Sequence, residues 1–249
     1  MELDFAFYAV AVPVVLYAGI DKTGFGSATS VAATAFLVLI LEPAVAVAIM
    51  LPLLIVMDFT ALRPNWNRWD PHVARVMIIG TGVGAFIGAA LIFVISPSTF
   101  RFAIGTIALV FVAIQASRRF GWLKAGDNMP DSAGYAFATL AGVTSCVAHA
   151  GGPVASIYLL TKNLSKSAYQ ATTIVTFWIN NLIKAVLYMS LGLIGWDTAF
   201  VTLTLVPVAI AGTLMGVYLN RVVPERVYFG LIYLFLTVTG TKLILDALL

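Results

Sequence analysis

The sequence predicts an all-α polytopic membrane protein made of two inverted repeats, each a short broken-helix hairpin followed by three transmembrane helices. Composition is the first reason: 61% of the 249 residues are hydrophobic and only 10% are charged, whereas a soluble domain is about half apolar and a quarter charged. The other two reasons are the apolar segments that fill each half and the short motifs that recur about 127 positions apart. The net charge of +3 belongs to the loops between segments, so no nucleic-acid partner is expected.

Each half contains five apolar segments. In the first half they cover residues 5–20, 28–41, 44–62, 73–95 and 100–116, and in the second half 133–147, 153–160, 168–193, 199–219 and 227–248. A membrane-spanning helix needs roughly 20 residues, so the last three segments of each half are expected to cross the membrane. The first two segments of each half are too short. They are expected to form a hairpin, either re-entrant or made of two tilted crossings.

Two breaks separate the short segments. The first is the stretch 21–27 (DKTGFGS), and the second is the stretch 148–153 (AHAGGP). Glycine relaxes the backbone and proline removes a hydrogen-bond donor, so no helix is expected to run unbroken through either stretch. A broken backbone persists at membrane depth only where protein or a water-filled cavity surrounds it. Breaks in corresponding halves therefore indicate the binding site of a transporter.

Four motifs recur in the same order in both halves. They are Trp69-Asp70 and Trp196-Asp197, Pro97 and Pro224, Gly84-x-x-x-Gly88 and Gly212-x-x-x-Gly216, and Ala18-Gly19 and Ala141-Gly142. The nearly constant spacing indicates a duplication, with repeat 1 at 1–117, a cytoplasmic connector at 118–132 and repeat 2 at 133–249. Glycines spaced four apart, together with Gly80, are expected to pack helices closely.

Basic residues predict the topology, because Lys and Arg collect in cytoplasmic loops. Ten of the fourteen fall at segment ends that would share one side: Arg63, Arg68, Arg75, Arg118, Arg119, Lys124, Lys162, Lys166, Arg221 and Arg226. Placing this side in the cytoplasm leaves the N-terminus outside. The first hairpin then enters from outside and the second from inside, so their tips are expected to meet near the midplane.

The hairpin tips are the expected substrate site. Helices that restart after Gly24 and Gly152 would present unpaired N–H groups and the positive end of the helix dipole, which suits an anion. The residues expected to bind the substrate are Lys22, Thr23, Gly24, Gly26, Ser27, Ser145, His149, Gly151, Gly152, Asn180, Asn181 and Lys184.

Several of these residues have an alternative role. Lys22 either binds the substrate or pairs with Asp21 and extends to the surface. His149 either donates to an anion and titrates during transport, or is structural. Asp58 either carries a coupling proton or pairs with Arg63. No cluster of Cys, His, Asp and Glu has metal-ligand spacing, so neither a metal nor another cofactor is expected.

A polar stripe marks the segment 168–193. Thr173, Phe177, Asn180, Lys184 and Tyr188 step by three or four residues and share one helix face. A polar, cationic stripe in an apolar helix is expected to face the protein interior. The alternative is hydrogen bonding between helices, with the lysine of the stripe extending to the outer surface.

With the breaks and the repeat established, the chain resembles the TauE/SafE family of sulfite exporters. The resemblance is carried by residues 17–26 (YAGIDKTGFG), by Ala141-Gly142 and by residues 149–154 (HAGGPV), which look like the family's His-x-Gly-Gly-Pro pattern. It covers nearly the whole chain and implies transport of sulfite or small organosulfur anions. It also implies site roles for Gly24, Gly26, His149, Gly151, Gly152 and Pro153.

The predicted function is that of a secondary transporter, not an enzyme, which exports sulfite, sulfoacetate or a related sulfonate by alternating access. The expected location is the bacterial inner membrane, with the lipid bilayer and the small anion as partners. The oligomeric state stays open, a homo-oligomer included. The main alternative is an anion channel for the same substrates. A less favoured one is an integral membrane enzyme, in which Ser145 would be the nucleophile and His149 its base.

Overall fold

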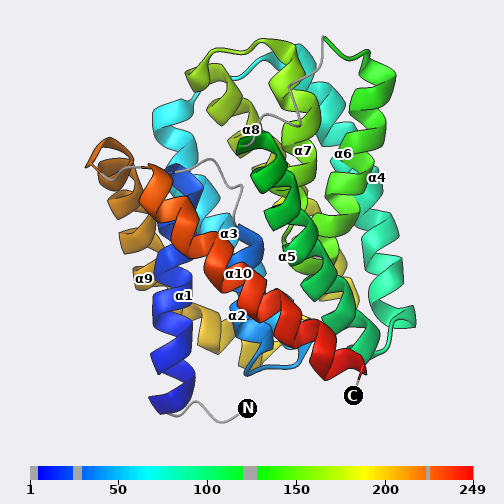
Figure 1. Cartoon of the computed structure of the whole chain (residues 1–249), viewed down its shortest axis with the longest axis vertical. Coiled ribbons are helices and arrows are strands. Elements are labelled where there is room, and N and C mark those ends of the chain that lie inside the picture. Colours follow the sequence, from blue (N-terminus) through cyan, green and yellow to red (C-terminus); the bar gives the residue numbers. More distant parts are fainter. Residues whose placement is uncertain (1–4, 25–29, 120–127, 223–224, 249) are drawn as a thin grey trace.

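The computed structural model describes residues 5–24, 30–119, 128–222 and 225–248 (Figure 1). These residues form ten α-helices and two short 3-10 helices, with no strand among them. The α-helices are α1 (Phe5–Gly24), α2 (Ser30–Val38), α3 (Pro43–Leu62), α4 (Pro71–Val94), α5 (Pro97–Arg119), α6 (Asp131–Ala148), α7 (Gly151–Leu159), α8 (Lys166–Ser190), α9 (Trp196–Val222) and α10 (Glu225–Leu248). The 3-10 helices are η1 (Arg63–Asn65) and η2 (Leu160–Lys162). The predicted all-α class is confirmed.

Five stretches of the described chain are long and apolar enough to cross a membrane. They are Phe5–Thr23, Pro43–Asn65, Pro71–Ile92, Pro97–Ile114 and Trp196–Leu219. The chain is therefore a multi-pass membrane protein. Helix α8 is 25 residues long, but two asparagines and a lysine near its middle lower its hydropathy.

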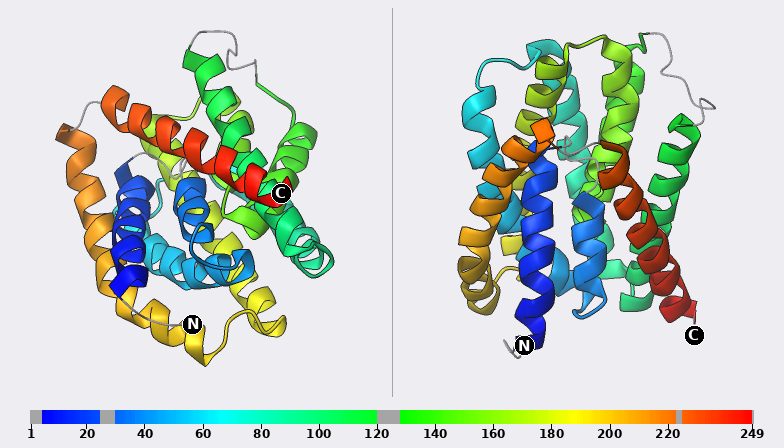
Figure 2. Two further views of the ribbon diagram at one scale, coloured as in Figure 1. Left: turned by 60° about the horizontal axis from the view of Figure 1, so that its bottom comes forward. Right: turned by 60° about the vertical axis from the view of Figure 1, so that its left-hand side comes forward.

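Two hairpins of helices enter the bundle from opposite ends. Helices α1 and α2 meet near the middle and open toward the end where the N and C marks lie (Figure 1). Helices α6 and α7 also meet near the middle but open toward the other end, and the further views show the same arrangement (Figure 2). The two hairpin tips therefore lie at similar depth.

The first break begins later than the sequence predicts. Helix α1 has 20 residues and runs through Asp21, Lys22 and Thr23 to Gly24, so the prediction that this segment is too short to cross was wrong. The polar residues remain helical because they have partners on other helices. Lys22 forms an ion pair with Asp58, and the Thr23 hydroxyl donates to the carbonyl of Thr213 at 2.6 Å.

The second break is only two residues long. His149 ends α6 in the left-handed conformation, with φ at 52°, and its N–H donates to the Ser145 carbonyl at 3.0 Å. Ala150 then precedes α7, which begins at Gly151 rather than after Gly152 as predicted. Pro153 fits there because the first turn of a helix needs no N–H donor at that position.

Close glycine contacts join each half to the other. Helix α4 packs on α6, and α9 packs on α1. A Cβ atom added to Gly84 of α4 would lie 2.0 Å from the Thr139 carbonyl of α6, and one added to Gly212 of α9 would lie 2.5 Å from the Leu16 carbonyl of α1. The glycine rows of the fourth helix in each half thus contact the first helix of the other half. Their predicted packing role is confirmed.

Helices α3 and α8 cross between these two pairs. Helix α3 packs on α9 and α8, while α8 packs on α4 and α3. The middle of α3 is almost wholly buried, with Ile49, Met50, Leu51, Leu53 and Met57 in the core. This arrangement places the polar face of α8 opposite α3 and against the tip of the α6–α7 hairpin.

Candidate functional site

A small cavity lies where the tip of the second hairpin meets α1, α3 and α8. It is lined by Lys22, Leu54, Ser145, His149, Gly152, Phe177 and Asn181. Its volume is about 20 Å³, enough for about one water molecule. Five of the twelve predicted site residues line it, although they come from four different helices.

Lys22 is bound by a carboxylate from α3. Its ammonium pairs with Asp58 Oδ1, and the two side chains are only 4% and 0% exposed. Asp58 Oδ2 accepts a hydrogen bond from Asn181 Nδ2 of α8 at 2.7 Å. The expected alternatives, Lys22 with Asp21 and Asp58 with Arg63, are therefore replaced by a link across three helices.

Lys184 is buried directly behind the cavity. Its ammonium donates to the carbonyl of Ser145 at 3.0 Å, to the hydroxyl of Ser145 at 3.1 Å and to His149 Nδ1 at 2.9 Å. An ammonium has three N–H donors, so each has an acceptor, and none of these acceptors is an acid. Asn180 Nδ2 adds a bond to the Ser145 hydroxyl at 3.1 Å. The predicted interior face of α8 is confirmed, and the alternative that Lys184 extends to the outer surface was wrong.

Both ring nitrogens of His149 have protein partners. Nδ1 accepts from the Lys184 ammonium, which leaves the proton on Nε2 to donate to the Val47 carbonyl of α3 at 3.0 Å. Since each role is fixed by its partner, the imidazole is neutral in this network. His149 therefore holds the hairpin tip against α3 and orients Lys184.

The start of α7 faces the same cavity through Gly152. The residue before this helix provides no side-chain cap, so the first N–H groups have no partner within the helix. Gly151 is needed for packing, because a Cβ there would lie 2.6 Å from the Ala141 carbonyl and 2.7 Å from the Phe177 ring.

The other predicted residues are placed differently. The hydroxyl of Thr23 faces α9, and its carbonyl accepts from Gln170 Nε2 of α8 at 3.1 Å. Gly24 is the last residue of α1. Gly26 and Ser27 lie outside the described residues.

Asp58 belongs to the polar network beside the cavity but is absent from the predicted site set. Its signal in the sequence was a carboxylate within an apolar segment, but its partner was expected to be the nearby Arg63. Its actual partner, Lys22, lies 36 positions earlier on another helix. Phe177 and Leu54 also line the cavity. Phe177 belongs to the predicted interior stripe of α8, whereas Leu54, an apolar residue of an apolar helix, gave no signal of its own.

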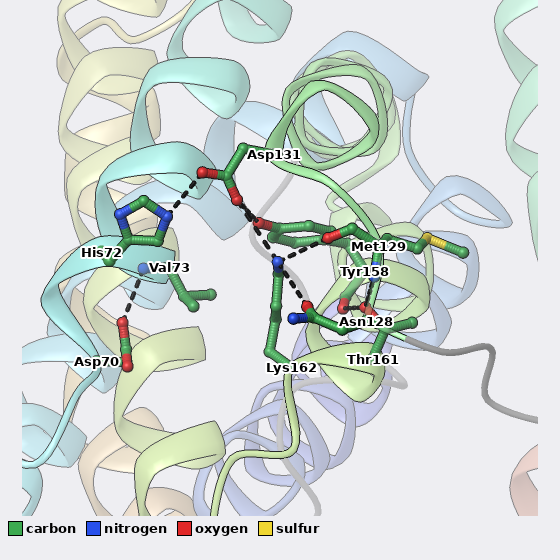
Figure 3. Close-up of polar contacts among 9 residues, drawn as sticks. All are labelled: Asp70, His72, Val73, Asn128, Met129, Asp131, Tyr158, Thr161 and Lys162. Carbon is green, nitrogen blue, oxygen red and sulfur yellow. Dashed lines mark hydrogen bonds and ion pairs between the residues drawn. The ribbon is translucent and has the colours of Figure 1, made fainter.

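A second polar cluster lies at the end of the molecule where α6 begins (Figure 3). Asp131 accepts from Tyr158 at 2.9 Å, pairs with His72 at 2.7 Å and lies 3.5 Å from the Lys162 ammonium. The hydrogen bond from Tyr158, together with His72 and Lys162, lowers the pKa of the Asp131 carboxyl. Burial and the nearby Asp131 raise the pKa of Tyr158. These contacts join the α6–α7 hairpin to the start of α4.

Ser145 and His149 do not form a nucleophile and base pair. Lys184 binds both side chains, and the His149 nitrogens are directed at Lys184 and Val47. A nucleophile needs a base within hydrogen-bond reach, and among the described residues this pair does not provide one.

Five helices long and apolar enough to cross a membrane define the class of multi-pass membrane proteins, and a small cavity lies among the helices of this bundle. The model of the sulfite exporter TauE/SafE family matches residues 11–243, and the chain belongs to this family. The comparisons with curated proteins and with solved structures found no match.

Proposed function

We propose that this protein exports sulfite, sulfoacetate or a related sulfonate across the bacterial inner membrane by alternating access, with no cofactor. The observation that carries the proposal is the cavity itself. Lys22 and Asn181 line it, the start of α7 faces it, and Lys184 lies directly behind it. Ammonium groups, amide N–H groups and a helix N-terminus are all donors suited to an oxyanion.

Alternating access is supported by the way the two halves pack. The contact of α4 with α6 corresponds to that of α9 with α1, and the hairpins open toward opposite ends. Inverted repeats would produce this correspondence. We assign two moving bodies on this basis, one built on α1, α3 and α9, and the other on α4, α6, α7 and α8.

Hydrogen bonds on either side of the cavity connect these bodies. Gln170 of α8 donates to the carbonyl of Thr23 at the end of α1, and His149 donates to the carbonyl of Val47 near the start of α3. Helix α8 starts at the end where α3 finishes (Figure 1). We assign the Gln170 bond to the inner gate and the His149 bond to the outer gate, with the basic loops in the cytoplasm and the N-terminus outside.

A channel for the same anions is the alternative. Burial of the lining residues favours a carrier, because Lys22, Ser145, His149 and Asn181 are each almost fully covered and the cavity has room for only about one water molecule. An open pore would leave such residues wetted along a continuous path.

The test is flux in proteoliposomes that contain the purified protein. We expect radiolabelled sulfite and sulfoacetate to leave the vesicles at a rate that saturates with concentration. Unlabelled anion on the opposite side should accelerate this flux by counterflow. Vesicles without protein control for leakage, and malonate is the carboxylate analogue matched to sulfoacetate.

Three outcomes would contradict the proposal. Flux that rises linearly without counterflow would indicate a channel. Chemical conversion of the anion without flux would indicate an enzyme. Equal transport of malonate and sulfoacetate would show that the protein does not select for a sulfur oxyanion.

A further inference from the structure

The hydroxyl of Ser145 accepts two hydrogen bonds inside the bundle. The Lys184 ammonium donates to it at 3.1 Å, and Asn180 Nδ2 donates to it at 3.1 Å. A hydroxyl has two acceptor lone pairs and one O–H donor, so both lone pairs are occupied. The proton of Ser145 is therefore left to donate, and it goes to none of the residues that the structure describes.

The cavity is the place where an acceptor for this proton can bind. Ser145 lines the cavity, whereas Lys184 and Asn180 are not among the lining residues and are fully buried behind it. A serine or threonine in a helix can instead donate to a carbonyl of the preceding turn. The neighbouring Thr144 does so, with the Leu140 carbonyl at 3.0 Å, but Ser145 makes no such bond.

We infer that Ser145 donates a hydrogen bond to the bound anion, and that Lys184 and Asn180 are positioning residues that direct this donor without touching the substrate. This inference rests on the proposed function and assigns roles within the same cavity. It gives Lys184 and Asn180 a different role from the direct substrate binding that the sequence predicts for them.

The physical reason is that the two bonds fix the direction of the proton and strengthen it as a donor. A hydroxyl that accepts from an ammonium is polarised, because hydrogen bonds in a chain reinforce one another at low dielectric. A bond from such a donor to a charged oxygen is stronger than one between neutral groups. Ser145 therefore requires an acceptor oxygen at this point of the ligand, such as an oxygen of sulfite or of a sulfonate group. An ammonium group of a ligand would find no acceptor there.

Dissociation constants of sulfoacetate for the purified protein test the role of Ser145. Ser145→Ala should weaken binding by about tenfold to a hundredfold, because a hydrogen bond to a charged group is lost. Ser145→Cys keeps the shape but has only a weak donor, so its affinity should be intermediate. Thr144→Ala is the matched control, since that hydroxyl donates within its own helix, and it should bind like the wild type.

A double-mutant cycle tests whether Asn180 acts through Ser145. Asn180→Leu removes the donor without changing the charge, so it should weaken sulfoacetate binding in the wild type but hardly at all in the Ser145→Ala background. Such non-additivity is expected of residues that share one interaction, whereas a purely structural role would weaken both backgrounds equally. Lys184→Met should show only partial non-additivity, because its charge also attracts the anion.

Melting temperatures show which variants are folded, and Ser145→Cys replaces Ser145→Ala in the cycle if the alanine variant does not fold. The inference is overturned if folded Ser145→Ala and Ser145→Cys bind sulfoacetate like the wild type. The proton would then be directed to Asn180 Oδ1, which is buried without a partner. Fully additive losses in Ser145→Ala and Asn180→Leu would overturn the positioning role.

Failure of the proposed function gives a different result, because wild-type vesicles would then show no saturable flux of radiolabelled sulfite or sulfoacetate. A protein with saturable flux whose dissociation constant is unchanged in the Ser145 variants retains the function and refutes the role of Ser145.

Discussion

Lys22 of α1 and Asp58 of α3 form an ion pair in which both side chains are buried. Asn181 of α8 completes the coordination of the carboxylate. A buried pair of this kind stabilises little compared with an apolar pair, but the loss of one partner leaves a bare charge in the protein interior. Removing one partner of the pair should therefore lower the stability of the protein by a measurable amount.

Lys22→Gln should lower the stability of the protein by about 3–5 kcal/mol, because the Asp58 carboxylate loses its counter-charge. Adding Asp58→Asn should recover most of that loss, and melting temperatures in detergent would measure both. The exposed pair Lys242–Asp246 is the matched control, and breaking it should cost less than about 1 kcal/mol. If Lys22→Gln melts like the wild type, the buried pair is absent in solution.

Gly152→Val should abolish anion binding while the protein still folds. Gly152 lines the cavity at the start of α7, so a branched side chain there would fill the space in front of the free N–H groups. Dissociation constants for sulfite and melting temperatures separate the two effects. Gly195→Val is the control, because nothing lies within 4 Å of a Cβ at that position. Wild-type affinity in Gly152→Val would place the anion elsewhere.

The two proposed gates should respond to separate variants. Leu54→Cys in a Cys146→Ser background puts a reporter thiol in the cavity wall, since Cys146 is the only native cysteine. His149→Asn, which tolerates the left-handed backbone, should increase labelling by an impermeant thiol reagent from outside. Gln170→Ala should increase labelling from the cytoplasmic side.

Right-side-out and inside-out vesicles measure the two accessibilities. Equal labelling from both sides in either variant would mean that the two hydrogen bonds do not control opposite entrances. Labelling in the reverse order would exchange the inner and outer assignments and invert the proposed topology.

Gly84→Ala should destabilise the protein strongly, because its Cβ would lie 2.0 Å from a backbone carbonyl of α6. Overpacking against a side chain costs about 1–3 kcal/mol, and contact with backbone forces the helices apart. Gly195→Ala, which meets nothing, should change the melting temperature little. Equal melting of the two variants would show that α4 and α6 are not in backbone contact.

The sequence alone determined the class, most of the helical segments and the place of the second break. Hydropathy and the effects of glycine and proline are properties of neighbouring residues, so they can be read without a fold. The polar stripe of α8 is also local, because a helix places residues three and four apart on one face. The family resemblance could also be recognised locally, because His149, Gly151 and Gly152 belong to one short continuous motif.

Only the tertiary structure decided which charges meet. The pairing of Lys22 with Asp58, the continuation of α1 through Lys22 and the direction of Thr23 toward α9 depend on how far each helix is rotated about its axis. Glycine contacts such as those of Gly84 and Gly212 fix that rotation by bringing distant backbones together. Such contacts join residues from opposite halves of the chain, and no local pattern determines which ones meet.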